Sequence, residues 1–362
     1  MCPQPRIRDR NLRAPNRLVD ISAFDFHLPD NLIAQQPLAE RDAARMLVVD
    51  RARQTWRDCH FKELPQQLST GDVLVINNTR VFPARLRGRR IPFGGSVELL
   101  LAREVKRNTW EALARPARRL RVGDQVEFAG GALIARVAEL LDQGIRLIEF
   151  ETDENLDDVI DRIGEPPLPP YINRADALDD DRHRYQTVYA TERGAIAAPT
   201  AGLHFTPAVF ETLKERGVQV EEITLHVGYG TFEPVRVADI SKHKVAAERF
   251  SVSERTADHL NQARRSGNRI IAAGTTTARA LESAASFAGE IRGQSGAASL
   301  TIVPGYEFRV IDALLTNFHL PKSSLLMLVS AFAGRELVLA AYRHAVEKGY
   351  RFYSYGDCML VL

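Results

Sequence analysis

Residues 84–151 constrain the fold more than any other stretch, because they are patterned almost entirely as short strands. Turn sequences such as Gly94-Gly95 and Gly130-Gly131 separate the apolar runs, and such punctuation is typical of antiparallel hairpins. The pattern predicts strands at 84–87, 96–102, 109–114, 124–128, 133–139 and 145–151. Closure removes the unpaired edges of a sheet, so this succession of short strands favours a small β-barrel.

The remaining chain alternates between helices and strands. Strands at 46–50 and 55–61 are predicted to pair antiparallel, and 73–77 is predicted to be a buried strand. Beyond residue 200, helices are predicted at 207–216, 253–265, 274–287, 323–332 and 336–348, and strands at 218–227, 269–273, 300–303 and 350–355. Such alternation indicates an α/β fold with a largely parallel sheet.

The length of the chain, 362 residues, exceeds that of most single hydrophobic cores. We therefore expect a larger α/β domain made of 21–65 and 156–362, with a smaller antiparallel β-barrel domain inserted at 66–155. Residues 1–20 carry several arginines and no following apolar run. They are expected to form a disordered basic arm rather than a secretory signal.

Charge is distributed unevenly, although the net charge is only +2. Residues 79–121 contain twelve Lys and Arg against three Glu, a balance of +9, and residues 151–181 contain eleven Asp and Glu against two Arg, a balance of −9. The basic stretch indicates an anionic partner such as RNA. Two solvated faces, or a pairing of the two stretches with each other, would give the same pattern. The candidate phosphate-binding residues are Arg80, Arg85, Arg115, Arg118 and Arg119.

The cysteines and the hydropathy narrow the class of protein further. Cys2, Cys59 and Cys358 are far apart and have no metal-ligand spacing. No apolar run approaches the roughly 20 residues of a membrane helix. We expect a cytoplasmic protein without a bound metal ion, since none of the common catalytic metal or nucleotide motifs occurs.

Polar residues and glycines gather in the stretch 194–206. Pro199 cannot donate to a sheet, Gly202 permits close backbone approach, and His204 precedes a predicted helix start at Thr206. This combination indicates a ligand pocket, and a buried crossover between two layers would explain it equally well. His226 lies at the end of the predicted strand 218–227 and precedes a glycine turn.

Two further polar clusters lie in the second half of the chain. Gly274, Thr275, Thr276 and Thr277 open a helix and, with Arg279, suggest a site for a carboxylate or phosphate. A simple threonine-capped helix is the alternative. Thr316, Asn317 and His319 are polar residues in an apolar context, where a lone histidine is more often a satisfied core residue. Several such clusters at strand ends favour a site at one edge of an α/β sheet.

Long segments of the chain resemble one known family. They are 24–51, 71–86, 167–171, 184–205, 225–234, 274–283, 304–334 and 350–360, and they include LHVGYGTFEP and DALLTNFHLPKSSLLMLVSAFAG. In these the chain resembles the S-adenosylmethionine:tRNA ribosyltransferase-isomerases of queuosine biosynthesis. The resemblance implies transfer of the ribosyl part of S-adenosylmethionine to 7-aminomethyl-7-deazaguanine at the wobble position of tRNA. Epoxyqueuosine would form, with release of adenine and methionine. S-adenosylmethionine is then a co-substrate, and we expect no true cofactor and a monomeric protein.

This chemistry needs a base for a C–H beside the sulfonium, an acid for the departing adenine and a neutral amine nucleophile. Histidines suit these proton transfers, and the candidates are His204 and His226, with His319 third. The helix start at 274–277 and Arg279 are candidates for the methionine carboxylate. The remaining candidate lining residues are Thr200, Gly202 and Asn317.

One motif departs from the family pattern His-x-Met-His-x-Glu. Here His243 and Glu248 are present, but Val245 and Ala246 stand where the family has Met and the second His. Two other hypotheses therefore stay open. The chain could be a non-catalytic tRNA-binding paralogue, or a ribosyltransferase that acts on a free base.

Overall fold

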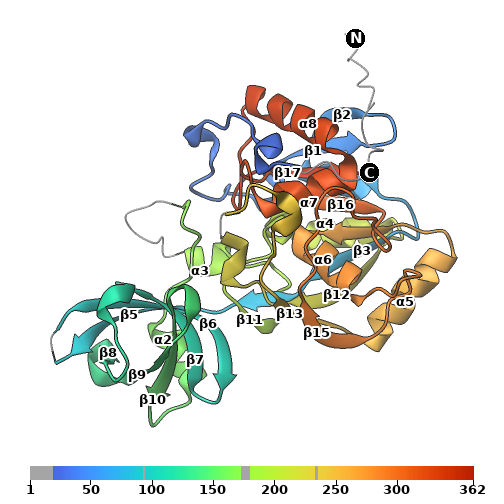
Figure 1. Cartoon of the computed structure of the whole chain (residues 1–362). Coiled ribbons are helices and arrows are strands. Elements are labelled where there is room, and N and C mark those ends of the chain that lie inside the picture. Colours follow the sequence, from blue (N-terminus) through green and yellow to red (C-terminus); the bar gives the residue numbers. More distant parts are fainter. Residues whose placement is uncertain (1–18, 93, 173–179, 233–234) are drawn as a thin grey trace.

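The computed structural model describes residues 19–362 except 93, 173–179 and 233–234 (Figure 1). The predicted basic arm at 1–20 lies almost wholly outside the described residues. Within them, no single helix is both long and apolar enough to cross a membrane. Helices α7 and α8 pass the same length and composition test only as a pair, which is bent by 116°.

A nine-stranded sheet organises the larger part of the chain, in the order β15-β13-β12-β3-β14-β16-β17-β1-β2. Its four central strands, β12, β3, β14 and β16, are parallel, as are β17 and β1, and the other neighbours are antiparallel. The predicted parallel arrangement therefore holds for the centre and not for the flanks. The strands are β1 (Arg45–Asp50), β2 (Thr55–His60), β3 (Val73–Asn77), β12 (Gln219–Leu225), β13 (Glu248–Val252), β14 (Ile270–Ala273), β15 (Gln294–Ala298), β16 (Ala313–Asn317) and β17 (Cys358–Val361).

Helices cover both faces of this sheet because its central strands are apolar on both sides. In β3, Val73 and Val75 join the core shared with α5 to α8, whereas Leu74 and Ile76 join the core shared with α1 and α4. Thr206 caps α4 and Ser253 caps α5, as predicted. The helices are α1 (Leu64–Gln67), α4 (Pro207–Glu215), α5 (Glu254–Arg265), α6 (Thr275–Ala284), α7 (Ser324–Ala333) and α8 (Arg335–Glu347).

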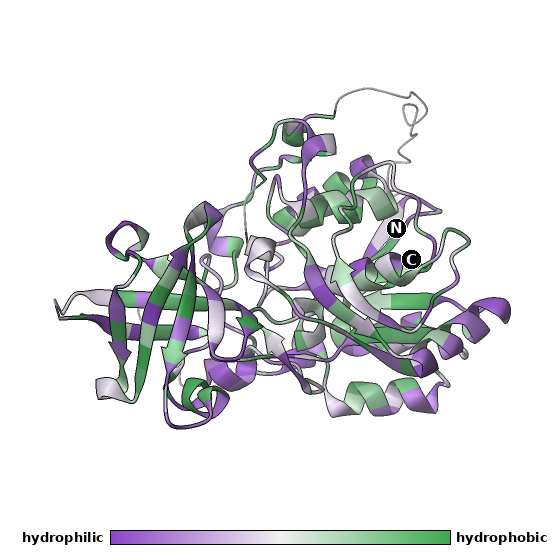
Figure 2. Ribbon diagram, turned by 60° about the horizontal axis from the view of Figure 1, so that its bottom comes forward, coloured by the Kyte–Doolittle hydropathy of each residue, from purple (hydrophilic) through white to green (hydrophobic). Residues whose placement is uncertain are grey.

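The predicted barrel is present, closed in the order β10-β7-β6-β5-β8-β9. Hydrophobic and hydrophilic residues alternate along its strands (Figure 2), so one side chain in two points into the barrel core. Helix α2 (Leu156–Ile163) adds Leu156, Val159 and Ile160 to that core. The strands are β5 (Arg85–Ile91), β6 (Ser96–Lys106), β7 (Thr109–Arg115), β8 (Gln125–Phe128), β9 (Leu133–Leu140) and β10 (Ile145–Glu151).

The two parts are connected near a short parallel pair of strands, β4 (Thr79–Val81) and β11 (Glu192–Ala195), which lies between them in Figure 1. The segment 66–155, predicted as the inserted barrel, thus also contains β3, a central strand of the larger sheet. The apolar pattern of β3 shows that it is buried but not in which sheet, because pairing partners lie more than a hundred residues away.

Two predicted strands are absent. Residues 300–303 form no strand, and the edge strand is β15, whose small and polar residues gave no apolar signal. Residues 350–355 form a turn in which Tyr353 has a φ of +75°. The strand follows the turn as β17.

Candidate active site

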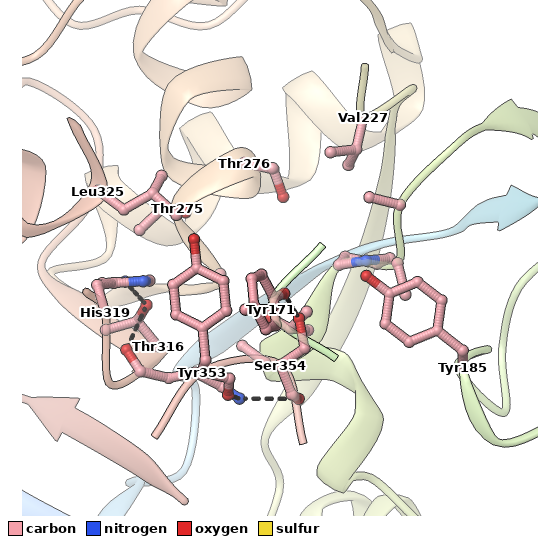
Figure 3. A pocket seen from close by; sticks show the side chains of 17 residues that line it. Tyr171, Tyr185, Val227, Thr275, Thr276, Thr316, His319, Leu325, Tyr353 and Ser354 are labelled. Carbon is pink, nitrogen blue, oxygen red and sulfur yellow. Dashed lines mark hydrogen bonds between the residues drawn. The ribbon is translucent and has the colours of Figure 1, made fainter. Parts of the chain in front are cut away.

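The main cavity lies at the carboxyl edge of the parallel strands, where α/β proteins commonly bind ligands. It encloses about 540 Å³, including the part open to solvent. Segments that follow β12, β14 and β16 line it, together with 197–201 and 353–354 (Figure 3). Of the candidate residues, the cavity brings together Thr200, Gly274, Thr275, Thr276, Asn317 and His319.

The start of α6 forms one wall of this cavity. The Gly274 N–H donates to the Leu315 carbonyl at 2.7 Å, and the φ of +102° at Gly274 turns the chain from β14 into the helix. The next backbone N–H groups belong to the first helical turn and have no partner within the helix. Thr275 and Thr276 face the cavity opposite Ser354 (Figure 3). This wall therefore offers N–H donors and hydroxyls to an anionic group.

Arg279 and Thr277 do not line the main cavity. The Arg279 guanidinium donates to Glu248 Oε2 at 2.5 Å and to the Ala298 carbonyl at 2.9 Å, and both side chains of the ion pair are buried. Thr277 is fully buried and donates to the Ala273 carbonyl at 2.8 Å. Thr277 and Arg279 lie near the helix start in the sequence, but the helix directs their side chains away from the cavity.

His319 follows β16 and contributes a buried imidazole to the cavity wall. Its Nε2 lies 2.9 Å from Thr316 Oγ1, and its backbone N–H donates to the Tyr342 hydroxyl at 3.0 Å. Desolvation by burial lowers the pKa of His319 to about 3. The ring is therefore neutral near pH 7 and is held by groups that carry no charge.

His204 lies behind the cavity rather than in its wall. It ends the short helix Thr200–His204, and its Nε2 lies 3.1 Å from Asn317 Oδ1. Since that oxygen only accepts, Nε2 carries the proton. Burial lowers the pKa of His204 to about 4, against a partial opposing effect of the Asn317 bond.

Asn317 also connects His204 to the turn that lines the cavity. Its Nδ2 donates to the carbonyls of Tyr353 and Ser354, at 2.8 and 3.2 Å. Tyr353 has a positive φ, a backbone conformation that costs a residue other than glycine on the order of 1 kcal/mol. The chain His204–Asn317–turn thus stabilises an unfavourable backbone conformation beside the cavity.

Three tyrosines of the lining were not among the candidate residues. Tyr171, Tyr185 and Tyr353 surround Ser354, and the Tyr171 hydroxyl is hydrogen-bonded to Ser354 Oγ (Figure 3). Burial raises the pKa of Tyr353 to about 12. The sequence YSYGD, which contains Tyr353 and Ser354, is a signal for this part of the lining, because it places polar side chains at the end of a predicted strand.

His226 and Gly202 lie close to the cavity but outside its wall. His226 Nδ1 is 2.9 Å from Thr79 Oγ1, and the ring packs on Gly194, where a Cβ would come within 2.7 Å of it. The ring is partly exposed, and desolvation lowers its pKa. A Cβ on Gly202 would come within 2.1 Å of the Tyr189 hydroxyl, so this glycine serves packing.

Val245 and Ala246 line a smaller neighbouring cavity of about 440 Å³, together with Glu248 and Arg279. Leu325 contributes to the walls of both cavities. The departure from the family motif is therefore located beside the main cavity and not in its wall.

The arginines predicted to bind RNA occupy two regions. Arg115, Arg118 and Arg119 are exposed on the barrel, and Arg80 is exposed on β4. None of these four forms an ion pair with another described residue. Arg85 is partly buried and donates to the Leu168 carbonyl at 3.1 Å, so its guanidinium is already engaged.

The loop that carries Arg118 and Arg119 is held by a buried arginine of the barrel. Arg146, which is buried, donates to the carbonyls of Ala117 and Leu120, at 2.8 and 3.3 Å. It thereby holds the loop that carries Arg118 and Arg119. Within the described ranges, no group of three His, Cys, Asp or Glu is arranged to hold a metal ion.

The protein is an α/β protein with a cavity at the carboxyl edge of its sheet, which is the place where proteins of this class commonly bind small molecules. The family described as "Queuosine biosynthesis protein" matches residues 21–361, and the chain belongs to that family. It is also similar to the crystal structure, at 2.00 Å resolution, of an S-adenosylmethionine tRNA ribosyltransferase from Thermotoga maritima. The identity is 37%, the match covers 94% of this chain and all of the other, and the TM-score is 0.54.

Proposed function

We propose that this protein transfers and isomerises the ribosyl part of S-adenosylmethionine onto 7-aminomethyl-7-deazaguanine at the wobble position of tRNA. Epoxyqueuosine-tRNA, adenine and methionine are the products. The observation that carries the proposal is the match at 37% identity, over nearly the whole of both chains, to an S-adenosylmethionine tRNA ribosyltransferase. The cavity supports it by its place at the carboxyl edge of the parallel strands, where α/β proteins commonly bind small organic ligands.

The start of α6 suits the methionine end of S-adenosylmethionine. A carboxylate near Thr275 and Thr276 would accept hydrogen bonds from free backbone N–H groups and be stabilised by the helix dipole. Arg279 is not needed for this contact, since its guanidinium is engaged by Glu248. S-adenosylmethionine is consumed as a substrate in this scheme, and the proposal requires neither a metal nor a bound cofactor.

Among the three candidate histidines, His319 alone lines the main cavity. It is neutral near pH 7 and is the histidine that can contact a bound substrate directly. We assign His204 a positioning role through Asn317, because it is separated from the cavity by the residue that it holds. His226 is the candidate for proton transfer on the side of β4, the strand that carries Arg80, because its ring contacts Thr79 of that strand.

Adenine release tests the proposed function. The purified protein is incubated with S-adenosylmethionine and tRNA that carries the deazaguanine base, and free adenine is measured with and without the tRNA. Release only with the modified tRNA is the expected result. Release with the free base alone would instead favour a ribosyltransferase that does not require tRNA.

The absence of the family's histidine at Ala246 favours a second candidate, the non-catalytic tRNA-binding paralogue. That protein would bind tRNA in a filter assay and release no adenine under the same conditions. The two candidates are therefore separated by measuring binding and release on one preparation.

A further inference from the structure

A second and larger cleft of about 1080 Å³ lies beside the main cavity. Strand β4, the segment before β11 and helix α3 (Asp181–Arg184) contribute to its walls. Four arginines line it, and the carboxylates in its wall are Asp161 and Asp181. The arginines are Arg41, Arg80, Arg182 and Arg193.

The arginines differ in how their charge is compensated. Arg193 is paired with Asp157 and Asp161, at 2.9 and 3.0 Å, and stacks on the Phe82 ring. Among the described residues, Arg182 donates only to backbone carbonyls, those of Asp161 and Gly164, at 2.9 and 2.7 Å. Such bonds orient a guanidinium without neutralising it.

Arg41 is held in the same way, by the carbonyls of Leu203 and His183 at 3.2 and 3.1 Å. Arg80 is exposed and lies opposite Arg193 in the β4–β11 pair. Within the described part of the chain, Arg41, Arg80 and Arg182 have no carboxylate partner. Three guanidinium groups are therefore available to an anionic ligand, while Asp161 is occupied by Arg193 and the buried Asp181 accepts from the Tyr355 hydroxyl at 3.3 Å.

Tyr185 connects this cleft with the main cavity. It is only 1% exposed and belongs to the walls of both. Nearby, the hydroxyl of Thr187 is buried in the wall of the cleft and has no hydrogen-bond partner among the described residues. A ligand in the cleft thus meets cationic groups and, at Tyr185, the boundary of the main cavity.

We propose that this cleft binds the phosphates of an unpaired RNA segment next to the reacting nucleotide, with Arg80 and Arg182 as phosphate contacts. Tyr185 then lies at the border between the bound phosphates and the small-molecule cavity in which the base of that nucleotide reacts. Unpaired RNA fits because its phosphates follow a cationic groove while its bases are free to turn toward a protein surface. The proposal rests on the proposed function for the identity of the reacting base, and not for the binding of RNA.

The test uses the full-length protein with Arg80→Gln and, separately, Arg182→Gln. The matched control is Arg255→Gln, on α5, which is exposed and has no ion pair with a described residue. Each cleft variant is expected to raise Kd and KM for tRNA roughly tenfold at low salt, with KM for S-adenosylmethionine unchanged. The slope of log Kd against log salt concentration should become shallower by about 0.7 for each lost contact.

Arg80→Gln should fold as the wild type does, because the Arg80 side chain makes no contact that folding requires. For Arg182→Gln, an unfolding curve shows whether the variant is folded. If both folded variants bind tRNA with the wild-type Kd and salt slope, the cleft is not the RNA site. If they weaken binding but the wild-type protein releases no adenine, the proposed function fails and the cleft assignment stands. Equal weakening by Arg255→Gln would mean a diffuse charge effect and would also overturn the assignment.

Discussion

The main cavity and the arginine-lined cleft meet at Tyr185, but the ionisable side chains of the two regions have opposite surroundings. Around the cavity, burial lowers the pKa of His204 to about 4 and that of His319 to about 3. In the cleft, Arg80 is exposed and Arg182 donates to backbone carbonyls, so neither guanidinium has a carboxylate partner among the described residues. One side of Tyr185 therefore suits proton transfer by neutral groups, and the other suits the binding of phosphates.

The largest effect is expected from Asn317→Ala, which would break the link between the cavity and its supporting histidine. The change leaves His204 Nε2 and the carbonyls of Tyr353 and Ser354 without a buried partner. Each of these three groups costs roughly 1–3 kcal/mol, so the free energy of unfolding should fall by about 3 kcal/mol or more. Adenine release should fall by roughly 1000-fold, and an unchanged rate would show that the turn does not depend on Asn317.

His319→Ala should lower kcat by roughly 100-fold, because it removes the imidazole that lines the cavity. The fold should persist, since the side chain of His319 bonds only to Thr316. Kinetics in both substrates, with a thermal unfolding curve as control, measure this. A loss of less than about tenfold would reject His319 as an acid or base and leave only a packing role.

Stability should decrease in acid because His204 and His319 are buried as neutral rings. Their pKa values of about 4 and about 3 lie below the roughly 6.5 of an unfolded chain. The unfolded state therefore binds more protons between pH 6.5 and 4. Each histidine then lowers the free energy of unfolding by about 1.4 kcal/mol per pH unit as the pH falls, and has no effect above that range.

His204→Gln isolates one of these contributions while retaining an N–H donor for Asn317. In denaturant titrations from pH 7 to 4, its stability should depend on pH less steeply than that of the wild type, by about 1.4 kcal/mol per unit. Adenine release should stay within about tenfold of the wild type, whereas His204→Ala should lose much more. Equal loss in both variants would mean that the imidazole itself takes part in proton transfer.

The smallest effect is expected from Ala246→His, which restores the residue of the family pattern. Ala246 lines the neighbouring cavity of about 440 Å³ and not the main one. Adenine release should change by no more than about threefold, with Kd for tRNA unchanged. A gain from undetectable to measurable release would establish the wild-type chain as the non-catalytic paralogue.

Local sequence patterns predicted most elements and part of the site. Turn residues and alternation located all six barrel strands, and the caps Thr206 and Ser253 located two helix starts. Glycine and threonine after β14 correctly marked a helix start, and that helix start lines the cavity. These features succeed because each depends on residues within about one turn of one another.

Side-chain direction and sheet membership were the features that local patterns missed. Arg279 follows the helix start closely but is turned toward Glu248, a residue of β13, by the helical period. Tyr353 was placed in a strand because its positive φ depends on Asn317, 36 residues earlier in the chain. The direction or backbone conformation of such a residue is therefore set by a distant hydrogen-bond or ion-pair partner and cannot be inferred from the residue itself.

The sequence by itself determined the two-part architecture, the family and the uneven charge of residues 79–121 and 151–181. Only the tertiary structure decided which histidine reaches the cavity, because His204, His226 and His319 have similar local surroundings in the sequence. It also brought Arg80 and Arg182, which are far apart in the chain, into one cleft with Tyr185 as the wall to the main cavity. The physical reason is that burial and charge pairing depend on long-range packing, whereas strands, turns and caps form from neighbouring residues.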